Sequence, residues 1–356
     1  MTAPSGDKAA RLIDVARRAQ VSRATAARAL GGYGLVTDAT RERVMAAAAE
    51  LDYRVNELAR SMRSGRTLTI GVVVADIGNS FFNQAIRAII ETASRAGYQI
   101  LVLNTDDDIA RERDAVRVLI EKRVDGLIVV PASQDDFAHL AARGEPGVPI
   151  VLLDRRVNSG AIDYVITDDR AAAAQAIRHL AGAGHSRIGL LVATAGVATF
   201  SPKMPAEVVG TVRDRVEGAR DAFAELGLAM RPDWTRFCRS NVEIARAAAT
   251  AILSLPDRPT ALLATNEEVA LGALGAAGAL GLRIGPDVSI IAFDDAPWSG
   301  VFTPPLSVIS RPVAQLGATA VELLLEKIGN AAARRAHSFT AELIARGSVT
   351  APQTGP

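Results

Sequence analysis

Apolar residues recur at helical spacing at the start of the chain. In the first segment they are Leu12, Val15, Ala16 and Ala19, which predicts a short helix with one packed face. Gln20-Val21 predicts a tight turn after this helix. Ser22 follows the turn, where its hydroxyl can cap a second helix that begins at Arg23.

A third helix is predicted from about Asp38 to Leu51. Thr37 is its expected cap, and its packing face is formed by Val44, Ala47, Ala48 and Leu51. Two short helices joined by a tight turn are typical of a helix-turn-helix domain, whose second helix enters the major groove of DNA with its N-terminal residues toward the base edges. The pattern therefore predicts a DNA-binding head.

Beyond residue 66 the pattern changes to apolar strands that alternate with amphipathic helices. Leu68–Val74 is a near-continuous apolar run, which is typical of a parallel strand buried on both faces. Helices are predicted at about Phe82–Ala96 and Ala110–Arg123. Further strands are predicted at Gln99–Leu103, Gly126–Val130, Ile150–Leu153, Tyr164–Thr167, Ile188–Val192, Ala261–Ala264 and Val288–Phe293. Repeated β-α-β units predict an α/β body of two doubly wound, Rossmann-like lobes with a ligand in the crevice at the carboxyl ends of the strands.

Charge is distributed unevenly between these two parts. Residues 1–66 contain 12 Lys and Arg against 7 Asp and Glu, whereas the rest of the chain contains 28 against 32. A basic segment that coincides with a helix-turn-helix pattern favours binding to DNA. The alternative is that a small surface helix is basic by chance.

Length and cysteine content restrict the class of protein further. The 356 residues allow a small head and a body of two domains. The single cysteine, Cys238, excludes a disulfide framework and a cysteine-based zinc site, and it is consistent with a reducing compartment. No apolar run has the length of a signal-peptide core at the N-terminus or of a membrane span elsewhere. We therefore expect a soluble, cytoplasmic protein that does not contact a membrane.

Sequence patterns of three enzyme classes are absent or incomplete. A nicotinamide-dependent dehydrogenase needs G-x-G-x-x-G after a strand, but the glycines from Gly272 to Gly281 recur every three residues in a helical segment and indicate close helix packing. Gly184-His185-Ser186 lacks the G-x-S-x-G elbow of a hydrolase and is typical of a helix-ending turn. The four histidines, at 139, 179, 185 and 337, lack metal-ligand spacing. We expect a protein that is not an enzyme and that holds no cofactor or metal.

A set of short motifs occurs in order along the whole chain. In the head these are Asp14-Val15-Ala16, Val21-Ser22, Thr40-Arg41-Glu42-Arg43-Val44 and Asp52-Tyr53-Arg54-Val55-Asn56. In the body they include Asn79-Ser80-Phe81-Phe82, Arg123-Val124-Asp125-Gly126-Leu127-Ile128, Gly184-His185-Ser186-Arg187-Ile188, Phe293-Asp294-Asp295 and Pro304-Pro305-Leu306. In order and spacing these motifs resemble those of the LacI/GalR family of transcription repressors over essentially the full length.

The resemblance implies a DNA-binding repressor with a sensor body of the periplasmic-binding-protein type I fold. The expected parts are a helix-turn-helix head at 1–54, a hinge helix at 55–66, a first lobe at 67–167 plus 312–336 and a second lobe at 168–311 plus 337–350. Two chains would form a homodimer whose paired heads bind a pseudo-palindromic operator. A small effector between the lobes would switch operator affinity, and the sequence leaves open whether it acts as an inducer or a corepressor.

The resemblance also implies which head residues contact DNA. By motif position, bases are read by Arg23, Ala24 and Arg28, and phosphates are contacted by Ser22 and Thr25. An arginine can bind the O6 and N7 atoms of guanine, whereas Ala24 offers only a methyl group. A phosphate contact is the alternative for Arg23. Tyr53 and Arg54 are expected to pack and to pin the third helix and the hinge against the DNA backbone.

The hinge is expected to contact DNA through Asn56, Ala59 and Met62. In the family this segment is helical on operator DNA, and a leucine wedges into the minor groove. Met62 stands at the position of that leucine, and methionine is also among the side chains that unstack base steps. The alternative is that Met62 is a linker residue without this role.

The body is expected to bind a carbohydrate, with a nucleobase as the second candidate. The residues at ligand-binding positions are Phe81, Phe82, Asp154, Arg155, Arg213, Arg215, Asn266, Asp294 and Trp298. Aromatic rings offer a flat face, and carboxylates, amides and guanidinium groups hold hydroxyls. Only one of Phe81 and Phe82 is expected to face the cleft. Asn266 could instead cap the following helix, and Trp298 could instead serve in packing.

Some positions depart from the family pattern. Ala292 stands where the pattern has glycine, and Glu267 follows Asn266 where the pattern has aspartate. The segment 193–205 is a longer loop than expected, which either shapes ligand choice or is a simple insertion. A solute-binding protein of a sugar uptake system is the alternative function, which the head and the missing signal peptide disfavour. The leucine-heptad tail of tetrameric relatives is missing, so a dimer is expected.

Overall fold

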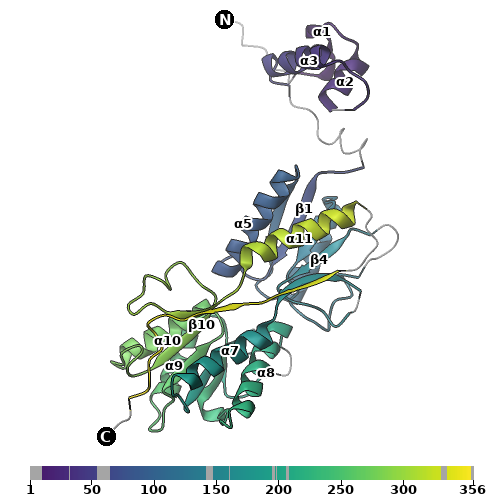
Figure 1. The fold of residues 1–356 in the computed structure, drawn as a ribbon. Helices are drawn as coiled ribbons and strands as arrows, with labels where there is room; N and C mark the ends of the chain where they lie inside the picture. The colour runs from purple at the N-terminus through teal and green to yellow at the C-terminus, as the bar shows by residue number, and fades with distance from the viewer. Residues whose placement is uncertain are drawn as a thin grey trace, which may run out of the picture. The chain divides into compact units, whose positions relative to one another are not determined.

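The computed structural model describes residues 10–31, 33–53, 65–141, 147–159, 161–194, 197, 199–205, 208–329 and 335–353. They form two units that divide between Thr67 and Leu68 (Figure 1). Arg54 and most of the hinge expected at 55–66, including Asn56, Ala59 and Met62, lie outside the described residues.

The first unit is a head of three helices built around small apolar side chains. The helices are α1 (Leu12–Arg18), α2 (Arg23–Gly31) and α3 (Asp38–Glu50). They share one core, formed by Val15, Ala16, Ala19, Ala26, Ala29, Val44, Ala47 and Ala48. Gln20 makes the turn between α1 and α2 with a φ of 55°, and an ion pair of 2.7 Å joins Arg18 Nη2 to Glu50 Oε2. The head thus has the predicted helices and packing faces.

The two predicted helix caps of the head differ in their hydrogen bonds. Ser22 Oγ accepts a hydrogen bond of 3.0 Å from the amide of Thr25, as predicted. The side chain of Thr37 makes no capping hydrogen bond to a backbone amide of α3, and its hydroxyl donates to Thr40 Oγ1 at 2.9 Å. Thr37 is the N-cap residue of α3, as predicted, but its hydroxyl bonds a neighbouring hydroxyl and not a backbone amide.

The second unit contains two mainly parallel sheets with helices on their faces. The strands are β1 (Thr69–Val74), β2 (Gln99–Asn104), β3 (Gly126–Val129), β4 (Ile150–Leu153), β5 (Asp163–Thr167), β6 (Ile188–Ala193), β7 (Phe200–Ser201), β8 (Thr235–Cys238), β9 (Ala261–Ala264), β10 (Ser289–Phe293), β11 (Ser307–Ser310), β12 (Ala336–Phe339) and β13 (Glu342–Ile344). The α-helices are α5 (Ser80–Arg95), α6 (Ile109–Glu121), α7 (Asp169–Gly182), α8 (Gly210–Glu225), α9 (Val242–Leu253), α10 (Glu267–Ala279) and α11 (Val313–Ile328). None of the described helices is long and apolar enough to cross a membrane.

The strand order confirms the predicted α/β class with two doubly wound lobes. The first sheet has the order β12-β5-β4-β3-β1-β2, and every neighbouring pair is parallel. The second sheet has the order β13-β11-β10-β9-β6-β8-β7, in which only the edge strands β13 and β7 are antiparallel. The strand β7 lies within the segment 193–205, so this segment contributes a sheet edge and is not only a loop.

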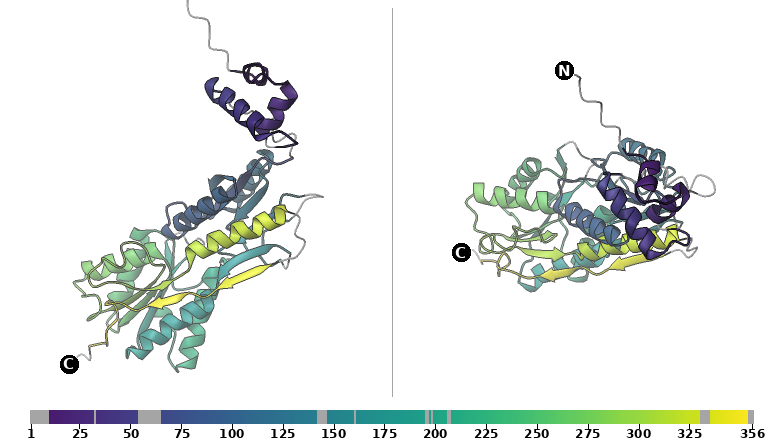
Figure 2. Two further views of the ribbon diagram at one scale, coloured as in Figure 1. Left: turned by 45° about the horizontal axis from the view of Figure 1, so that its top comes forward. Right: turned by 90° about the horizontal axis from the view of Figure 1, so that it is seen from above.

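Each sheet is the centre of one lobe, and the chain crosses between the lobes after β5, β11 and β12. After the second crossing α11 packs beside α5 in the first lobe (Figure 2). After β12, which pairs with β5, the chain returns to the second lobe. His337, Ser338 and Phe339 therefore belong to the first sheet, whereas the expected boundary assigns 337–350 to the second lobe. The expected boundary falls inside a strand because β12 completes an edge of the first sheet.

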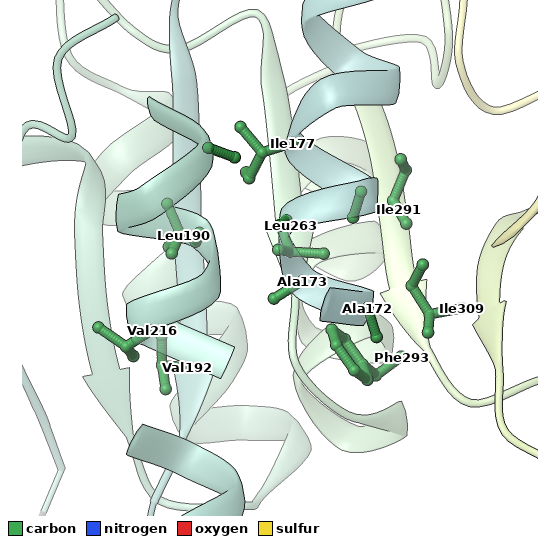
Figure 3. Packing of buried hydrophobic residues seen from close by; sticks show 14 of the residues in the cluster. Ala172, Ala173, Ile177, Leu190, Val192, Val216, Leu263, Ile291, Phe293 and Ile309 are labelled. Atoms are coloured by element: carbon green, nitrogen blue, oxygen red, sulfur yellow. The ribbon is translucent and has the colours of Figure 1, made fainter. Parts of the chain in front are cut away.

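Helices pack closely on both faces of the second sheet. Figure 3 shows Ile177 of α7 and Val216 of α8 among the apolar side chains that cover one face. On the other face α10 approaches α9 at Gly272, where an added Cβ would lie 2.5 Å from Ala245 Cβ. A side chain at Gly272 would force the two helices apart, so this glycine has the predicted packing role. At Gly278 an added Cβ would meet open space, so the role does not extend along the whole glycine run.

Candidate DNA-binding and ligand-binding sites

The N-terminus of α2 presents its first turn to solvent. Ser22 Oγ lies 2.8 Å from Thr25 Oγ1 and also accepts the amide of Thr25, so the first turn is fixed by one local cap. Ser22, Arg23 and Ala24 are exposed, and Thr25 is half-buried. A rigid, exposed first turn is what insertion of a recognition helix into the major groove requires.

Arg28 lies along the surface of its own helix. Its Nε donates to the carbonyl oxygen of Ala24 and its Nη2 donates to Thr25 Oγ1, both at 3.4 Å. These bonds are long, so little free energy opposes a swing of the guanidinium toward a base edge. Tyr53 is half-buried against the head core, and its amide donates to the carbonyl oxygen of Ala48 at 2.8 Å. Tyr53 therefore packs at the C-terminal end of α3.

In the body, predicted ligand residues gather where the carboxyl ends of the two sheets meet. Asp154 directly follows β4 in the first lobe, and Asp294 directly follows β10 in the second. Phe81 and Phe82 lie in the first turn of α5, which follows β1. In parallel α/β sheets this edge is where ligands bind.

Arg311 joins the two lobes at this edge. Its Nε and Nη2 donate to the two carboxylate oxygens of Asp294 at 2.7 and 2.9 Å, and its Nη1 donates to Asp154 Oδ1 at 2.6 Å. The guanidinium carbon lies 3.6 Å from the centre of the Phe81 ring. Burial alone would lower the pKa of Arg311, but the attraction of Asp294 and Asp154 outweighs it and raises the pKa, so the guanidinium stays charged.

Arg311 is not among the residues that the sequence indicates. It follows the strand β11, as Asp294 follows β10, and this position is the signal that could have identified it. The sequence pattern does not predict β11, because two of its four residues are serine and prolines lie close to it on both sides. Without that strand, nothing placed the arginine at the carboxyl edge of a sheet.

A second arginine, Arg215 of α8, binds a buried aspartate within the second lobe. Its Nε and Nη2 lie 2.9 and 2.8 Å from Asp169 Oδ2, and its Nη1 donates to the carbonyl oxygen of Thr265 at 2.6 Å. The guanidinium carbon lies 4.4 Å from the centre of the Phe293 ring. Burial raises the pKa of Asp169 in spite of the attraction of Arg215 and Arg311. Asp169, which the sequence does not single out either, thus belongs to the same electrostatic network.

Arg155 supports the network from the first lobe. Its Nη1 donates to Asp107 Oδ1 and, at 3.2 Å, to the carbonyl oxygen of Pro131. Its Nε lies 3.7 Å from Asp154 Oδ2. Asp154 therefore lies between two guanidinium groups, those of Arg155 and Arg311, which fixes its carboxylate at the boundary between the lobes.

Asn266 and Trp298 have partners within the second lobe. Asn266 Oδ1 accepts the amide of Val269 at 3.0 Å, so the residue caps α10, as the alternative for it proposed. Trp298 Nε1 donates to Glu267 Oε1 at 2.7 Å, and its ring meets Phe302 edge-on with centres 6.5 Å apart. Trp298 is half-buried against an apolar cluster, so the described contacts are those of packing.

The two neighbouring phenylalanines have different surroundings. Their rings meet at an interplanar angle of 80° with centres 5.1 Å apart, and both side chains are buried. Both belong to the apolar cluster of the first lobe, and Phe81 also contacts the guanidinium of Arg311. Phe81 is therefore the member of the pair that contacts the charged network.

Several buried polar atoms of this region have no hydrogen-bond partner among the described residues. They are Ser80 Oγ, Arg155 Nε, Thr167 Oγ1, Asp169 Oδ1 and Arg213 Nε. Two of these residues, Arg155 and Thr167, line a cavity of about 10 Å³ together with residues of both lobes that include Asp154 and Asp214. Buried polar atoms in proteins are nearly always paired with protein, water or ligand atoms. The partners that these atoms require are therefore water or ligand atoms rather than atoms of the described residues.

The sequence matches two family descriptions that together span both units. Residues 67–346 match the periplasmic binding proteins and sugar binding domain of the LacI family, and residues 11–56 match the bacterial regulatory proteins of the lacI family. The HTH-type transcriptional repressor PurR of Photobacterium profundum is 33% identical over 338 residues, which cover 94% of this chain and 97% of the relative. PurR of Aliivibrio salmonicida is 32% identical over 337 residues, which cover 94% and 98%.

Solved structures agree with these matches. The lac repressor dimer bound to operator and the anti-inducer ONPF has a TM-score of 0.83 at 27% identity, with 97% of this chain and 100% of that chain covered. A LacI family transcriptional regulator from Enterococcus faecium with bound ribose has a TM-score of 0.68 at 25% identity, with 80% and 99% covered. The predicted family is thereby confirmed: this chain belongs to the LacI family of bacterial transcriptional regulators, with a helix-turn-helix head and a sensor body like the periplasmic binding proteins.

Proposed function

We propose that this chain is a cytoplasmic, homodimeric repressor whose affinity for a pseudo-palindromic operator changes when a small ligand binds between its lobes. The buried, unpaired polar atoms at the interlobe network carry the ligand part of the proposal, because such atoms need a polar partner. The exposed first turn of α2 supports the DNA part. PurR relatives that match nearly the full chain, and a lac repressor dimer bound to operator, support both parts.

The ligand in this proposal is a carbohydrate, with a nucleobase as the second candidate. Among the described residues, Asp169 Oδ1 is a free acceptor and Arg213 Nε is a free donor, and a sugar hydroxyl can satisfy either kind of group. Relatives of similar fold have been solved with cellobiose and with ribose. The ligand leaves the cleft chemically unchanged, so a turnover assay with each bound compound should give no product.

The proposed DNA contacts are Ser22, Arg23, Ala24, Thr25, Arg28 and Tyr53 in the head and Asn56, Ala59 and Met62 in the hinge. Arg23 is the residue proposed to read a guanine, because its side chain is exposed in the first turn of α2. Met62 is proposed as the wedge between base steps. A solute-binding protein without a transcriptional role would have no use for these residues.

Selection of operator sequences followed by a ligand screen tests the proposal. The purified full chain would first select duplexes from a random pool, and we expect a pseudo-palindromic consensus. Thermal denaturation would then be followed with sugars, sugar phosphates and nucleobases, since a ligand that binds only the folded state raises its stability. Each compound that raises the melting temperature is titrated against the selected operator. A ligand that stabilises the protein without changing operator affinity would contradict the switch, and failure to select any duplex would contradict the repressor.

A further inference from the structure

The buried link that Arg311 makes between the lobes is asymmetric. Arg311 makes two hydrogen bonds to Asp294, which follows the neighbouring strand of its own sheet, and one to Asp154 of the other lobe. The side chains of Arg311, Asp154 and Asp294 are 4%, 6% and 6% exposed. A movement that parts the lobes would therefore break the single bond to Asp154 and leave the paired bonds to Asp294.

The position of Arg311 in the chain is suited to a movement of this kind. It lies on the crossing from β11 in the second lobe to α11 in the first lobe. The hydrogen bond from Val313 N to the carbonyl oxygen of Arg311, at 2.8 Å, closes a tight turn around Pro312. The guanidinium is thus held beside a connection that must flex when the lobe angle changes.

The cleft beside Arg311 has little free space. The cavity that Asp154 helps to line is about 10 Å³, which is about the space that one water molecule needs. The Phe81 ring, which could offer a flat face to a ligand, is covered by the Arg311 guanidinium at 3.6 Å. A carbohydrate can enter only if the lobes part or if the guanidinium moves away from Asp154 and Phe81.

We propose that Arg311 is a positioning residue of the ligand site that latches the lobes in a closed arrangement without ligand. Arg311 stays bound to Asp294 throughout. Its hydrogen bond to Asp154 forms when the lobes close and breaks when they open. The proposal rests on the proposed function for the identity of the site, but the latch itself requires no ligand. When a ligand enters, its hydroxyls compete with the guanidinium for the Asp154 carboxylate.

Interlobe distances in the ligand-free full chain test the latch. Spin labels at Ser94→Cys in α5 and Gln175→Cys in α7 would report on the two lobes, because both positions are exposed. The native Cys238 is fully buried, and burial raises the pKa of its thiol to about 12, so it does not take up label. Labelled chains would be diluted with unlabelled chains, so that distances within one subunit are measured.

Two variants remove different parts of the latch. Asp154→Asn removes the carboxylate charge that pairs with Arg311 across the lobes and with Arg155 within the first lobe, and Arg311→Gln removes the bonds to both aspartates. We expect both to add a longer distance population or to lengthen the mean distance. Arg178→Gln, which removes an exposed ion pair with Glu225 in the second lobe, is the matched control and should leave the distances unchanged. If Arg311→Gln does not fold, Asp154→Asn decides the question.

Unchanged distances in folded Asp154→Asn would overturn the latch. A ligand from the sugar and nucleobase panel that still stabilises this variant would then leave the proposed function in place. Conversely, open lobes in both variants together with no binding by any member of the panel would support the latch and count against the proposed carbohydrate. The two proposals can thus fail separately.

Discussion

Asp154 and Asp294 bind the same guanidinium from opposite lobes, and both have a left-handed backbone, with φ values of 65° and 74°. Each aspartate directly follows a central strand of its sheet. Residues other than glycine seldom adopt this conformation, although aspartate tolerates it better than most. Such local strain is often found at functional sites, where the surrounding structure holds it in place.

Replacing Asp294 should destabilise the sensor body strongly. Asp294→Ala leaves one side of a buried guanidinium without its carboxylate, and the loss of one partner of a buried pair costs about 3–5 kcal/mol of unfolding free energy. Chemical denaturation of the full chain, followed by tryptophan fluorescence, measures the change. Glu225→Ala removes one partner of an exposed pair in the same lobe and should change the stability far less. Equal stability changes in the two variants would show that the buried network contributes no more to stability than an exposed ion pair.

Replacing Arg23 should reduce sequence discrimination by the head. Arg23→Ala is expected to weaken binding to the selected operator by about 1–3 kcal/mol, because a bidentate contact to guanine is lost. Binding to a scrambled duplex should weaken much less. Fluorescence anisotropy with both duplexes at one salt concentration measures the ratio. An equal loss on the two duplexes would instead assign Arg23 to a phosphate, which is the alternative that the sequence leaves open.

Ser22 and Thr37 precede two helices of the head, so replacing each in turn compares a cap that has a side-chain hydrogen bond with one that has none. Ser22→Ala removes the acceptor of the Thr25 amide and should destabilise α2 by about 0.5–2 kcal/mol. Thr37→Ala should have a smaller effect on α3, because the Thr37 side chain caps no backbone amide there. Hydrogen exchange in the full chain compares each variant with the unmodified protein, and a larger acceleration of α3 by Thr37→Ala than of α2 by Ser22→Ala would contradict the assignment.

We predict that protonation of His185 lowers the stability of the folded chain at acidic pH. Its Nε2 donates to the carbonyl oxygen of Thr350 at 2.9 Å, and its Nδ1 lies 2.8 Å from Thr260 Oγ1. Burial lowers the pKa of His185 in the folded state, so the unfolded chain binds the proton first. Stability from this residue is therefore complete above the unfolded pKa, about 6.5, and is lost as the pH falls below it toward the folded pKa.

Thermal denaturation between pH 7.5 and pH 5 tests this role of His185. His185→Asn should be less stable than the unmodified chain at pH 7.5 and should lose less stability on acidification. His337→Asn, at an exposed position of β12, is the control and should reproduce the pH dependence of the unmodified chain. An unchanged pH dependence in His185→Asn would assign the acid sensitivity to other groups.

The sequence predicts those helices and strands whose apolar residues recur with a clear period, and the core residues within them. The continuous apolar run at β1 and the helical spacing of Val15 and Ala16 are examples, since each is decided by neighbours in the chain. The short strands β8 and β11 are not predicted, because their four residues mix polar and apolar side chains, whereas the equally short strands β3, β4 and β9 are apolar runs and are predicted.

The same limit applies to the candidate ligand site. Asp154 and Asp294 match motif positions, but their relation depends on Arg311, which lies far from Asp154 in sequence. Asp169 and the Phe293 ring likewise gain their roles from contact with Arg215. Contacts of this kind join residues that are distant in the sequence, which no local pattern records.

The strands β12 and β13 come late in the sequence, which affects when the two lobes can finish folding during synthesis. β12 completes the edge of the first sheet beside β5, and β13 pairs with β11 at the edge of the second. Domains commonly fold in order as the ribosome releases them. Here the first sheet, although it begins at residue 69, cannot be finished until residue 339 has been released, and the second needs residue 344. The two lobes therefore reach their final form almost together, and a ribosome that stalls before residue 336 leaves both sheets with an open edge.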